Sequence, residues 1–381
     1  MKQFYLPIKV ITGVGCFSQL PEVVRSYGQR ALLVCGQSAL RRSGILDRAL
    51  HDLHGAKLQV VLYDEARAEP TVEMAQKALD LARREQVEVV ISIGGGSALD
   101  VGKAVAALYK QAGTVREYHS GRTVEERGLP FISVPTTAGT GTEVTNNAVL
   151  TDPDTGIKQS IRGAYLTAVA AVVDPELTLT LPPEITAGSG ADALCQSIES
   201  FVSVAAQPIT DALTSQAIQW IGRSLVRAYE QGSDVQARSD MLYGSLLTGM
   251  AMSHTRLGGA HALAHPLGYH YHIPHGVVCG LLLPYVMEYS LEYVPDRYAQ
   301  VAHLLGLDTR GATLREAAQQ AAAAARETTR KVGIPDRLCT FGVKHEDLPK
   351  LIQESLPSAN LKSNPKPLGA EDLQVILERA L

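Results

Sequence analysis

The sequence predicts an α/β domain over residues 1–180 and an all-α domain over residues 181–381. The chain has 381 residues, of which 45% are hydrophobic, enough for two domains with buried cores. Apolar runs of strand length alternate with helical patterns in the first half, whereas helical periodicity dominates from Glu184 onward. Pro182 and Pro183 interrupt both patterns, so we place the domain boundary near residue 180.

Four continuous apolar runs predict buried strands in the first domain. Helical spacing predicts helices over residues 71–86 and 97–109, with Ser97 as the N-cap of the second. Fully apolar strands that alternate with helices are typical of a parallel sheet covered on both faces. The expected strands are Arg30–Cys35, Lys57–Tyr63, Val87–Ile93 and Pro130–Val134.

Helical periodicity predicts the elements of the second domain. A shorter helix is expected to carry His261 and His265 and to end at Pro266, and His275 is expected to precede another helix. The long helices are expected over residues 187–204, 209–229, 235–252 and 314–332.

Charge and cysteine content argue against several classes of function. Lys and Arg number 35 and Asp and Glu 39, so the net charge is −4 and no basic excess exists to neutralise phosphates. The five cysteines are widely spaced and form no Cys-x-x-Cys pair. No apolar stretch reaches the roughly 20 residues of a spanning helix, and the N-terminus shows no secretory signal. We therefore expect a cytoplasmic protein with neither nucleic acid nor membrane as a partner.

A triple-glycine turn follows the third expected strand and opens a helix, from Gly94 to Lys103. Glycines let backbone N–H groups approach a phosphate, and the helix N-terminus adds a partial positive charge. The segment is not a Gly-x-Gly-x-x-Gly fingerprint, and it is not a Walker A loop because Ala104 follows Lys103. It predicts a phosphate cradle at the carboxyl end of a strand; the alternative is a tight turn without a ligand.

A second loop rich in glycine and hydroxyl groups, Pro135–Glu143, follows the fourth expected strand. Alone, this loop is equally well explained by hydroxyl groups that hold its own turns. Because the carboxyl ends of parallel strands meet at one edge of the sheet, the two loops together favour a nucleotide crevice.

Six of the eleven histidines fall between residues 254 and 275. His261 and His265 are spaced i and i+4 on one helix face, as are Asp192 and Gln196 upstream. One carboxylate with two or more imidazoles on helices suits Fe²⁺ or Zn²⁺. The alternative is a set of core or surface histidines without a ligand. We expect a surface position for the two histidines that lack helical phase with the others, His270 and His272.

Together these segments resemble the iron-containing (group III) alcohol dehydrogenase family, and the resemblance runs through the whole chain. It implies a Rossmann-like N-terminal domain and a helical C-terminal domain, an architecture shared with dehydroquinate synthases, with the active site in the cleft between them. It also implies hydride transfer between NAD(P) and a small alcohol, aldehyde or ketone, and a homo-oligomer of at least two subunits. Further matching segments are Phe4–Pro7 with Gly13–Gly15, Val173–Leu177, Ala191–Glu199 and Ser363–Leu368.

The resemblance also assigns site residues. The metal ligands of the family are one Asp and three His, of which Asp192, His261 and His275 are present. His265 is the extra histidine that lines the cleft, and we expect it to relay a proton or to orient the site. The glycine turn meets the diphosphate, the second loop meets the ribose and nicotinamide, and a lysine reaches the nicotinamide ribose. The expected cofactor residues are Gly36, Gly94, Gly95, Gly96, Ser97, Asp100, Thr136, Thr137, Thr140, Thr142 and Lys158.

Two departures from the family pattern concern the cofactors. Gln196 stands where the fourth metal ligand is His, and an amide oxygen is a harder and weaker donor for Fe²⁺ or Zn²⁺. We expect a metal at these four positions, with weak binding or a metal-independent site as alternatives. Gly36 and Gln37 stand where members that prefer NAD carry an Asp, so NADP is not excluded by charge.

The expected function is NAD(P)-dependent interconversion of a small alcohol with its aldehyde or ketone, in which a metal polarises the carbonyl group. Three alternatives stay open: a metal-independent reductase of an anionic oxo-acid, similar to maleylacetate reductases; a lyase or cyclase on the same scaffold; and a nucleotide-binding protein without catalysis. Arg256 is a candidate for binding an anionic substrate, although surface ion pairs are the more common role of such a residue.

Overall fold

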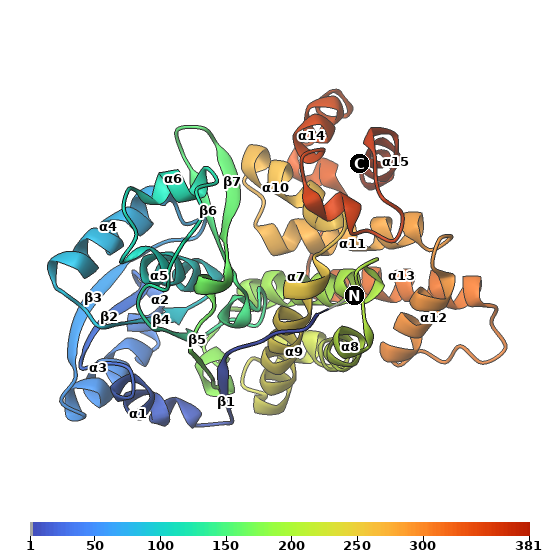
Figure 1. The fold of residues 1–381 in the computed structure, drawn as a ribbon. Coiled ribbons are helices and arrows are strands. Elements are labelled where there is room, and N and C mark those ends of the chain that lie inside the picture. Colours follow the sequence, from blue (N-terminus) through green and yellow to red (C-terminus); the bar gives the residue numbers. More distant parts are fainter. Residues whose placement is uncertain (1–2) are drawn as a thin grey trace. The chain divides into compact units, whose positions relative to one another are not determined.

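Six parallel strands form the centre of the first unit in the computed structural model, which describes residues 3–381 (Figure 1). The strands lie in the order β1-β8-β5-β4-β2-β3. The chain passes from β2 outward to β3 and then crosses to the other side of β2, which makes a topological switch point between β2 and β4. The strands are β1 (Lys9–Thr12), β2 (Arg30–Gly36), β3 (Gln59–Ala66), β4 (Val89–Gly94), β5 (Phe131–Pro135) and β8 (Ala170–Val173).

Helices cover both faces of this sheet, as the sequence predicts. Alternate residues of β2 enter two separate cores: Leu32 and Val34 pack with α4 and α5, whereas Ala31 and Leu33 pack with α1 and α3. The strand is apolar throughout because both of its faces are buried. The helices are α1 (Leu20–Arg25), α2 (Ala39–Arg42), α3 (Ile45–Gly55), α4 (Val72–Arg84), α5 (Gly96–Leu108) and α6 (Val115–His119).

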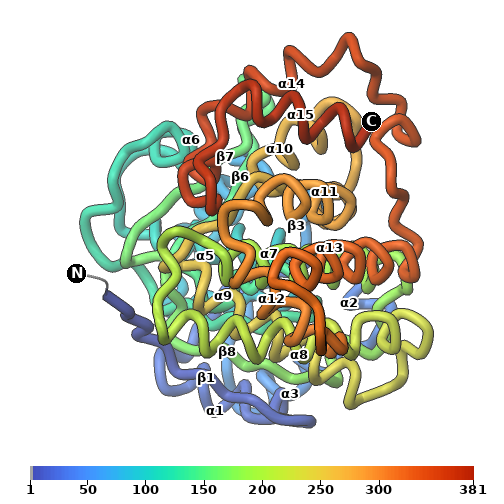
Figure 2. Tube along the Cα trace, turned by 90° about the vertical axis from the view of Figure 1, so that its right-hand side faces the viewer, coloured from blue at the N-terminus to red at the C-terminus, as the bar shows by residue number. Residues whose placement is uncertain are grey.

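The four expected strands are confirmed as β2 to β5 with shifted ends, but other elements of this unit differ from expectation. Ser97 is not an N-cap, because α5 begins at Gly96 and its N-cap is Gly95. The edge strand β1 and its neighbour β8 (Figure 2) have four residues each, too short to stand out from the sequence. An antiparallel pair, β6 (Asn147–Asp152) and β7 (Ile157–Arg162), follows the second loop and was not expected either.

Helices make up the second unit, and the long predicted helices are confirmed as α7, α8, α9 and α13. Pro266 does not end a helix as expected, because α10 continues through it to Tyr271. A proline removes one helical hydrogen bond, and here the packing of α10 against α11 and α14 outweighs that loss. The helices are α7 (Pro183–Val202), α8 (Pro208–Glu230), α9 (Val235–Thr255), α10 (Gly259–Tyr271), α11 (His275–Ser290), α12 (Pro295–Leu304), α13 (Leu314–Lys331), α14 (Leu348–Ser355) and α15 (Ala370–Ala380).

Two short segments that precede the long helical part of the chain also belong to the second unit. The first unit comprises Tyr5–Thr137 and Thr142–Thr180, and the second comprises residues 3–4, Ala138–Gly141 and Leu181–Leu381. Glycines in the short middle segment allow close packing on α9. The carbonyl oxygen of Gly139 accepts a hydrogen bond from Ser245 at 3.0 Å. Gly141 has a φ of 59°, and a Cβ there would lie 2.7 Å from the Cα of Gly249. Part of the second glycine loop therefore belongs to the helical unit.

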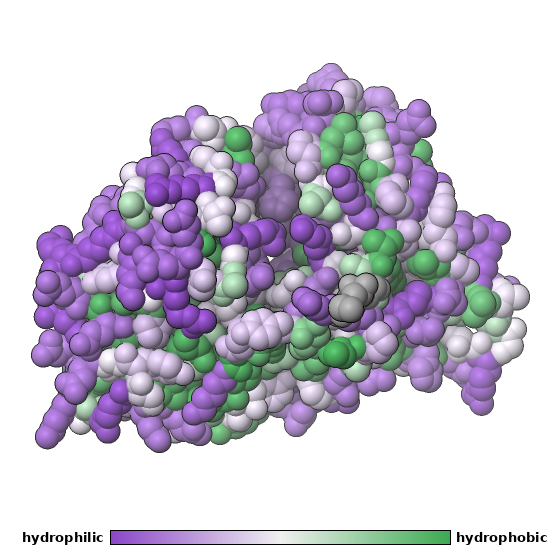
Figure 3. All heavy atoms as spheres, viewed as in Figure 1, coloured by the Kyte–Doolittle hydropathy of each residue, from purple (hydrophilic) through white to green (hydrophobic). Residues whose placement is uncertain are grey.

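Exposed apolar side chains on the described part of the chain are scattered. Hydrophilic residues cover most of the face seen in Figure 3, and large apolar side chains such as Tyr5, Val14 and Ile157 are exposed at scattered positions. Within residues 3–381, no helix combines the length and hydrophobicity needed to cross a bilayer.

Candidate active site

The carboxyl ends of β2, β4 and β5 carry three of the predicted cofactor segments side by side. The strand register pairs Cys35 of β2 with Ile93 of β4, and Gly94 of β4 with Pro135 of β5. The residues that follow these strands therefore meet at one edge of the sheet, next to the switch point. Open α/β sheets bind ligands at this position. The predicted residues brought together here are Gly36, Gly94, Gly95, Gly96, Ser97, Thr136 and Thr137.

The triple-glycine turn leaves little space for side chains at Gly94 and Gly95. A Cβ on Gly94 would lie 2.8 Å from the Cβ of Ala98, and one on Gly95 would lie 3.2 Å from the Oγ1 of Thr137. Because α5 starts at Gly96, the N–H groups of Gly96 and Ser97 have no acceptor within the helix. The first turn of α5 contains no acidic residue that would compensate its partial positive charge. The turn is thus suited to hold an anionic group by its backbone.

Two other predicted cofactor residues, Asp100 and Thr142, lie in a buried polar network. Asp100 accepts hydrogen bonds from the Oγ1 of Thr142 at 2.6 Å and from the N–H of Val149 at 3.1 Å. Burial raises the pKa of Asp100, and the nearby charge of Lys103 opposes that shift. The network joins α5 to the segment after β5, so Asp100 and Thr142 hold the two loops in place.

Lys103 is the centre of this network, and sequence reasoning assigned it no role of its own. Its Nζ donates to the carbonyl oxygens of Thr142 and Asn147 at 2.6 and 2.8 Å, and to the Oγ1 of Thr145 at 3.0 Å. Its side chain is fully buried, and burial lowers the pKa of Lys103 to about 8. A buried lysine with several oxygen acceptors fixes the backbone of the segment that it contacts.

The remaining two predicted cofactor residues are not part of this sheet edge. Lys158 lies in β7, where its Nζ pairs with Glu69 at 2.5 Å. Thr140 belongs to the segment of the second glycine loop that packs in the helical unit.

Three helices of the second unit bring the predicted metal ligands together. Asp192 and Gln196 lie on α7, His261 on α10, and His275 is the first residue of α11. The Oδ1 of Asp192 is 3.2 Å from the Nε2 of His261 and 3.9 Å from the Nε2 of His275. The Nε2 of Gln196 donates to the Oδ2 of Asp192 at 2.9 Å. Donor atoms bound to one Zn²⁺ ion at its usual distances lie about 3.3–3.8 Å apart, so this spacing suits a shared ion.

Glycines on α11 allow this convergence. A Cβ on Gly276 would lie 2.0 Å from the carbonyl oxygen of Gly188, and one on Gly280 would lie 2.7 Å from the Cβ of Ala191. Both contacts are with α7, so larger residues at these positions would separate the two helices. The close approach of α11 and α7 places His275 beside Asp192.

Glu199 orients His261, and sequence reasoning missed it. Its Oε2 lies 2.6 Å from the Nδ1 of His261, and its carboxylate accepts hydrogen bonds from the N–H groups of Gly258 and Ala260. A proton on Nδ1 leaves Nε2, which faces Asp192, as the ligand atom. The signal was present, because Glu199 follows Asp192 by two helical turns and lies on the same face of α7.

Cys279 also lies in the cluster and was missed as well. Ligand atoms of Asp192, His261, His275 and Cys279 all lie within 4.8 Å of one another. Burial acts to raise the pKa of Cys279, but a hydrogen bond with Cys195 and the charges of His261 and His275 lower it well below its usual value. Burial likewise opposes the charged form of His261, whose pKa is nevertheless raised by Cys279 and Glu199. The spacing of four residues from His275 is the signal that could have indicated this cysteine.

The residues of the cluster fit a divalent metal ion. Within residues 3–381, the buried Oε1 of Gln196 has no hydrogen-bond partner. A buried oxygen without a partner costs free energy, and a cation would provide that partner. A carboxylate, two imidazoles and this oxygen form a donor set for a borderline metal such as Fe²⁺ or Zn²⁺.

The other histidines of this stretch lie in different surroundings. His265 follows His261 by one turn on α10, and its ring centroid is 5.6 Å from that of His275. His270 is half-buried and pairs with Glu354 at 2.6 Å, whereas His272 is exposed as predicted. Arg256 is also exposed, at the C-terminal end of α9.

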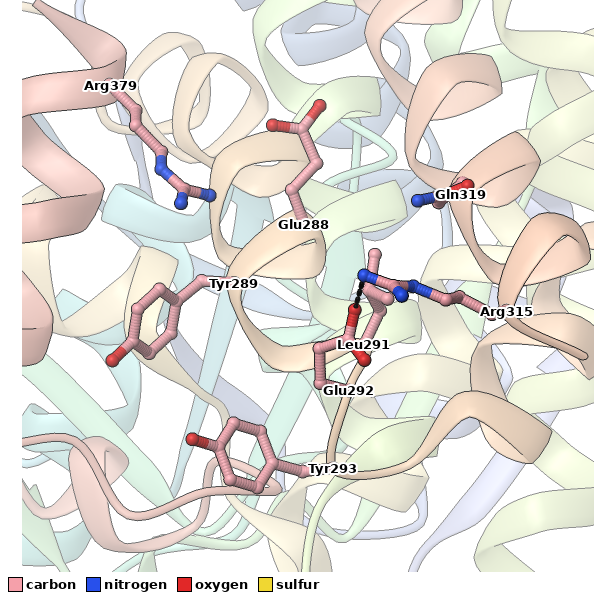
Figure 4. Close-up of a pocket in the computed structure, with 8 residues that line it drawn as sticks. All are labelled: Glu288, Tyr289, Leu291, Glu292, Tyr293, Arg315, Gln319 and Arg379. Carbon is pink, nitrogen blue, oxygen red and sulfur yellow. Dashed lines mark ion pairs between the residues drawn. The ribbon is translucent and has the colours of Figure 1, made fainter.

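A separate pocket of about 530 Å³ lies among α11, α13 and α15 (Figure 4). Arg315 and Glu292 pair at 2.6 Å on its wall. None of its lining residues belongs to the predicted site. They are Glu288, Tyr289, Leu291, Glu292, Tyr293, Arg315, Gln319 and Arg379.

Comparison with known proteins finds one family for both the N-terminal and the C-terminal part of the chain. The family description "Iron-containing alcohol dehydrogenase" matches residues 7–175, and "Fe-containing alcohol dehydrogenase family, C-terminal" matches residues 186–381. The chain belongs to the iron-containing alcohol dehydrogenase family. It is similar to long-chain-alcohol dehydrogenase 1 of Geobacillus thermodenitrificans, with 39% identity over 372 residues, 97% of this chain and 94% of that protein. It is also similar to 1,3-propanediol dehydrogenase of Klebsiella pneumoniae, with 35% identity over 94% of this chain and 95% of that protein.

Solved structures lead to the same family. The crystal structure of a 1,3-propanediol oxidoreductase matches with a TM-score of 0.96 and 35% identity, and the match covers 100% of both chains. The fold is that of the iron-containing alcohol dehydrogenases. The chain is therefore an NAD(P)-dependent alcohol oxidoreductase of a family that uses a divalent metal. These relatives do not favour a lyase, a cyclase or a protein without catalysis.

Proposed function

We propose that this chain interconverts a small alcohol and its aldehyde or ketone, with a divalent metal held by Asp192, His261 and His275 and with Gln196 as the fourth donor. The convergence of these side chains from three helices carries the proposal. The unpaired oxygen of Gln196 supports a cation there, because no other group within residues 3–381 satisfies it.

The dinucleotide part of the proposal rests on the sheet edge. We assign the diphosphate to the N–H groups of Gly95, Gly96 and Ser97, because they lie at the start of α5. Thr136 and Thr137, at the end of the neighbouring strand, are assigned to the ribose and nicotinamide. Gly36 lies at the end of β2 on the other side of the switch point. Contacts of Thr140 and Lys158 with the nicotinamide end remain predictions.

The side chains of the cluster have different roles in the proposed reaction. When bound, the metal supplies Lewis acidity toward the substrate oxygen. Glu199 fixes the tautomer of His261 through its 2.6 Å contact with Nδ1. In the direction of reduction, hydride from C4 of the nicotinamide forms the new C–H bond and the oxygen takes up one proton. We assign delivery of that proton to His265, a partly exposed residue of α10 whose ring lies near that of His275.

The end of β2 supports the use of NADPH. Gly36 is followed by Gln37, which is exposed and uncharged, so no carboxylate at this position repels a 2′-phosphate. We expect NADPH to be used at least as well as NADH. A preference for NADH of more than about a hundredfold, which corresponds to about 2.7 kcal/mol, would show that another group discriminates.

A substrate panel tests the proposed function. Oxidation of NADH and NADPH is followed by absorbance with short and long aldehydes, ketones and anionic oxo-acids. Turnover of neutral aldehydes or ketones supports the proposal. Selective turnover of oxo-acids by metal-free protein would instead favour the metal-independent reductase, and cofactor binding without turnover of any carbonyl compound would contradict catalysis.

A homo-oligomeric state and a cytoplasmic location also remain predictions of the sequence.

A further inference from the structure

Cys279 occupies a position in the cluster that the proposed ligand set does not use. It lies one helical turn after His275 on α11, so both side chains project from the same face of that helix. The Sγ of Cys279 is 3.6 Å from the Nε2 of His275. The side chain is completely buried, so solvent does not compete for its sulfur.

The distance from Cys279 to His275 suits a shared ion, and the other donors lie close by. Ligand atoms of Cys279, Asp192, His261 and His275 all lie within 4.8 Å of one another. Zn²⁺ binds sulfur at about 2.3 Å and imidazole nitrogen at about 2.0 Å, which places neighbouring donors about 3.5 Å apart. The Sγ of Cys279 lies 3.6 Å from the Nε2 of His275, close to that value, and the Oδ1 of Asp192 lies 3.2 and 3.9 Å from His261 and His275, on either side of it.

We propose that Cys279 is a metal ligand in this protein and supplies the strong fourth donor that Gln196 cannot. The inference rests on the proposed metal site. The resulting donor set is one thiolate, one carboxylate and two imidazoles. Gln196, whose Nε2 is hydrogen-bonded to Asp192, then adds at most a weak oxygen donor.

The donor chemistry has consequences for the choice of metal. Thiolate sulfur is a soft ligand that favours Zn²⁺, Co²⁺ and Fe²⁺ over Mg²⁺ or Mn²⁺, whereas an amide oxygen is hard. The thiol of Cys279 must lose its proton to solvent when the metal binds, so metal uptake releases a proton. The second buried cysteine near the cluster, Cys195, is grouped with Glu199 and His261 and not with the four donors.

Cobalt substitution tests this proposal directly. Metal-stripped protein is titrated with Co²⁺, which shows visible ligand-field bands at any site and an intense near-ultraviolet sulfur-to-cobalt charge-transfer band only when a thiolate is bound. We expect both signals in the unmodified protein and in the Gln196→Ala variant. Cys279→Ser should keep ligand-field bands but lose the charge-transfer band. Cys195→Ser is the matched control and should retain both signals.

Competition with a chelator gives a second readout. We expect Cys279→Ser to weaken Zn²⁺ affinity by about a hundredfold or more, the upper range seen even for supporting residues of metal sites. Cys195→Ser should weaken it far less.

The outcomes separate this inference from the function on which it rests. Stoichiometric Co²⁺ binding without a charge-transfer band in the unmodified protein would overturn Cys279 as a ligand and leave the metal site intact. No Co²⁺ binding at all would overturn the metal site itself. Because the spectrum of the unmodified protein decides the question, the test stands even if Cys279→Ser fails to fold.

Discussion

The glycine turn of the first unit and the side-chain cluster around Asp192 in the second differ in which groups they offer to a ligand. The turn consists of consecutive residues at the end of β4, and it offers backbone N–H groups. The cluster collects side chains from α7 and from the consecutive helices α10 and α11, which α8 and α9 separate from α7 in the sequence. A backbone site is fixed by local conformation, whereas a side-chain site depends on how three helices pack.

The two regions also differ in whether their buried polar groups have partners within the protein. On α5, Asp100 and Lys103 form an ion pair at 3.9 Å, and both form hydrogen bonds with Thr142. In the cluster, by contrast, Gln196 leaves a buried oxygen without a partner among residues 3–381. The first arrangement supports a loop, and the second has coordinating capacity left for a cation.

The largest effect should come from removing the shared carboxylate of the cluster. Asp192 contacts two of the proposed ligands, so Asp192→Ala should lose the metal and lower kcat/KM by about a thousandfold, or roughly 4 kcal/mol. Binding of NADPH should change little, because the turn lies in the other unit. Metal analysis, kinetics and fluorescence titration measure the three quantities. His303→Ala, at an exposed histidine, is the control, and an Asp192→Ala enzyme with full activity would contradict the comparison.

The dependence of stability on pH tests Glu143, a buried carboxyl group on which the charge of Lys103 acts. Glu143 is buried, and burial raises its pKa from 4.5 to about 7, so the folded state favours the protonated carboxyl group. That stabilisation is complete below about pH 4.5 and is lost as the pH rises through 7. Glu143→Gln imitates the protonated form, so it should match the unmodified protein near pH 4.5 and be more stable at pH 8, by at most about 3 kcal/mol.

Urea denaturation of cofactor-free protein at several pH values measures this difference. Glu126→Gln, at an exposed carboxylate, should show no such pH dependence. A Glu143→Gln protein less stable than the unmodified protein at pH 8 would show that the charged carboxylate has a partner that the network does not reveal.

Glu199→Gln tests whether metal affinity depends on a residue that contacts a proposed ligand without binding the metal itself. The amide cannot replace the carboxylate that accepts from His261 and two backbone N–H groups. We expect metal affinity to fall about 10- to 100-fold, with activity restored at high metal concentration. Chelator competition measures the affinity, and Glu230→Gln at the exposed end of α8 is the control. Unchanged affinity would leave Glu199 with a purely structural role.

The smallest effect is expected at the glycine turn. A Cβ on Gly95 would lie 3.2 Å from the Oγ1 of Thr137, so Gly95→Ala should displace the two loops slightly and raise KM for the dinucleotide about tenfold, or roughly 1.4 kcal/mol. Metal content should not change. Gly55→Ala is the matched control, because a Cβ there meets nothing within 4 Å. A change in kcat without a change in KM would place the turn outside the dinucleotide site.

The same contrast explains what could be predicted from the sequence. The glycine turn is recognisable because its residues are neighbours in the sequence and follow the end of an apolar strand. The pairs Asp192 with Gln196 and His261 with His265 were recognisable from helical spacing. Cys279 was read as one of five scattered cysteines, because its place beside Asp192 depends on the glycines that bring α11 against α7.

The wrong predictions have a related physical cause. Ser97 has the side chain of a good N-cap, but the turn uses the backbone of Gly95 instead. Pro266 is a strong local signal for a helix end, and the packing of α10 overrides it. In both cases the local preference was real and the surrounding structure outweighed it.

Metal removal and reloading tests the central claim most directly. Protein purified without chelator, protein treated with EDTA, and protein reloaded with Fe²⁺ or Zn²⁺ are compared for metal content and for NADPH-dependent reduction of an aldehyde. The account predicts up to one metal ion per chain, loss of activity as the ion is removed, and recovery on reloading, with NADPH binding unaffected throughout. Full activity in EDTA with no bound metal would contradict it.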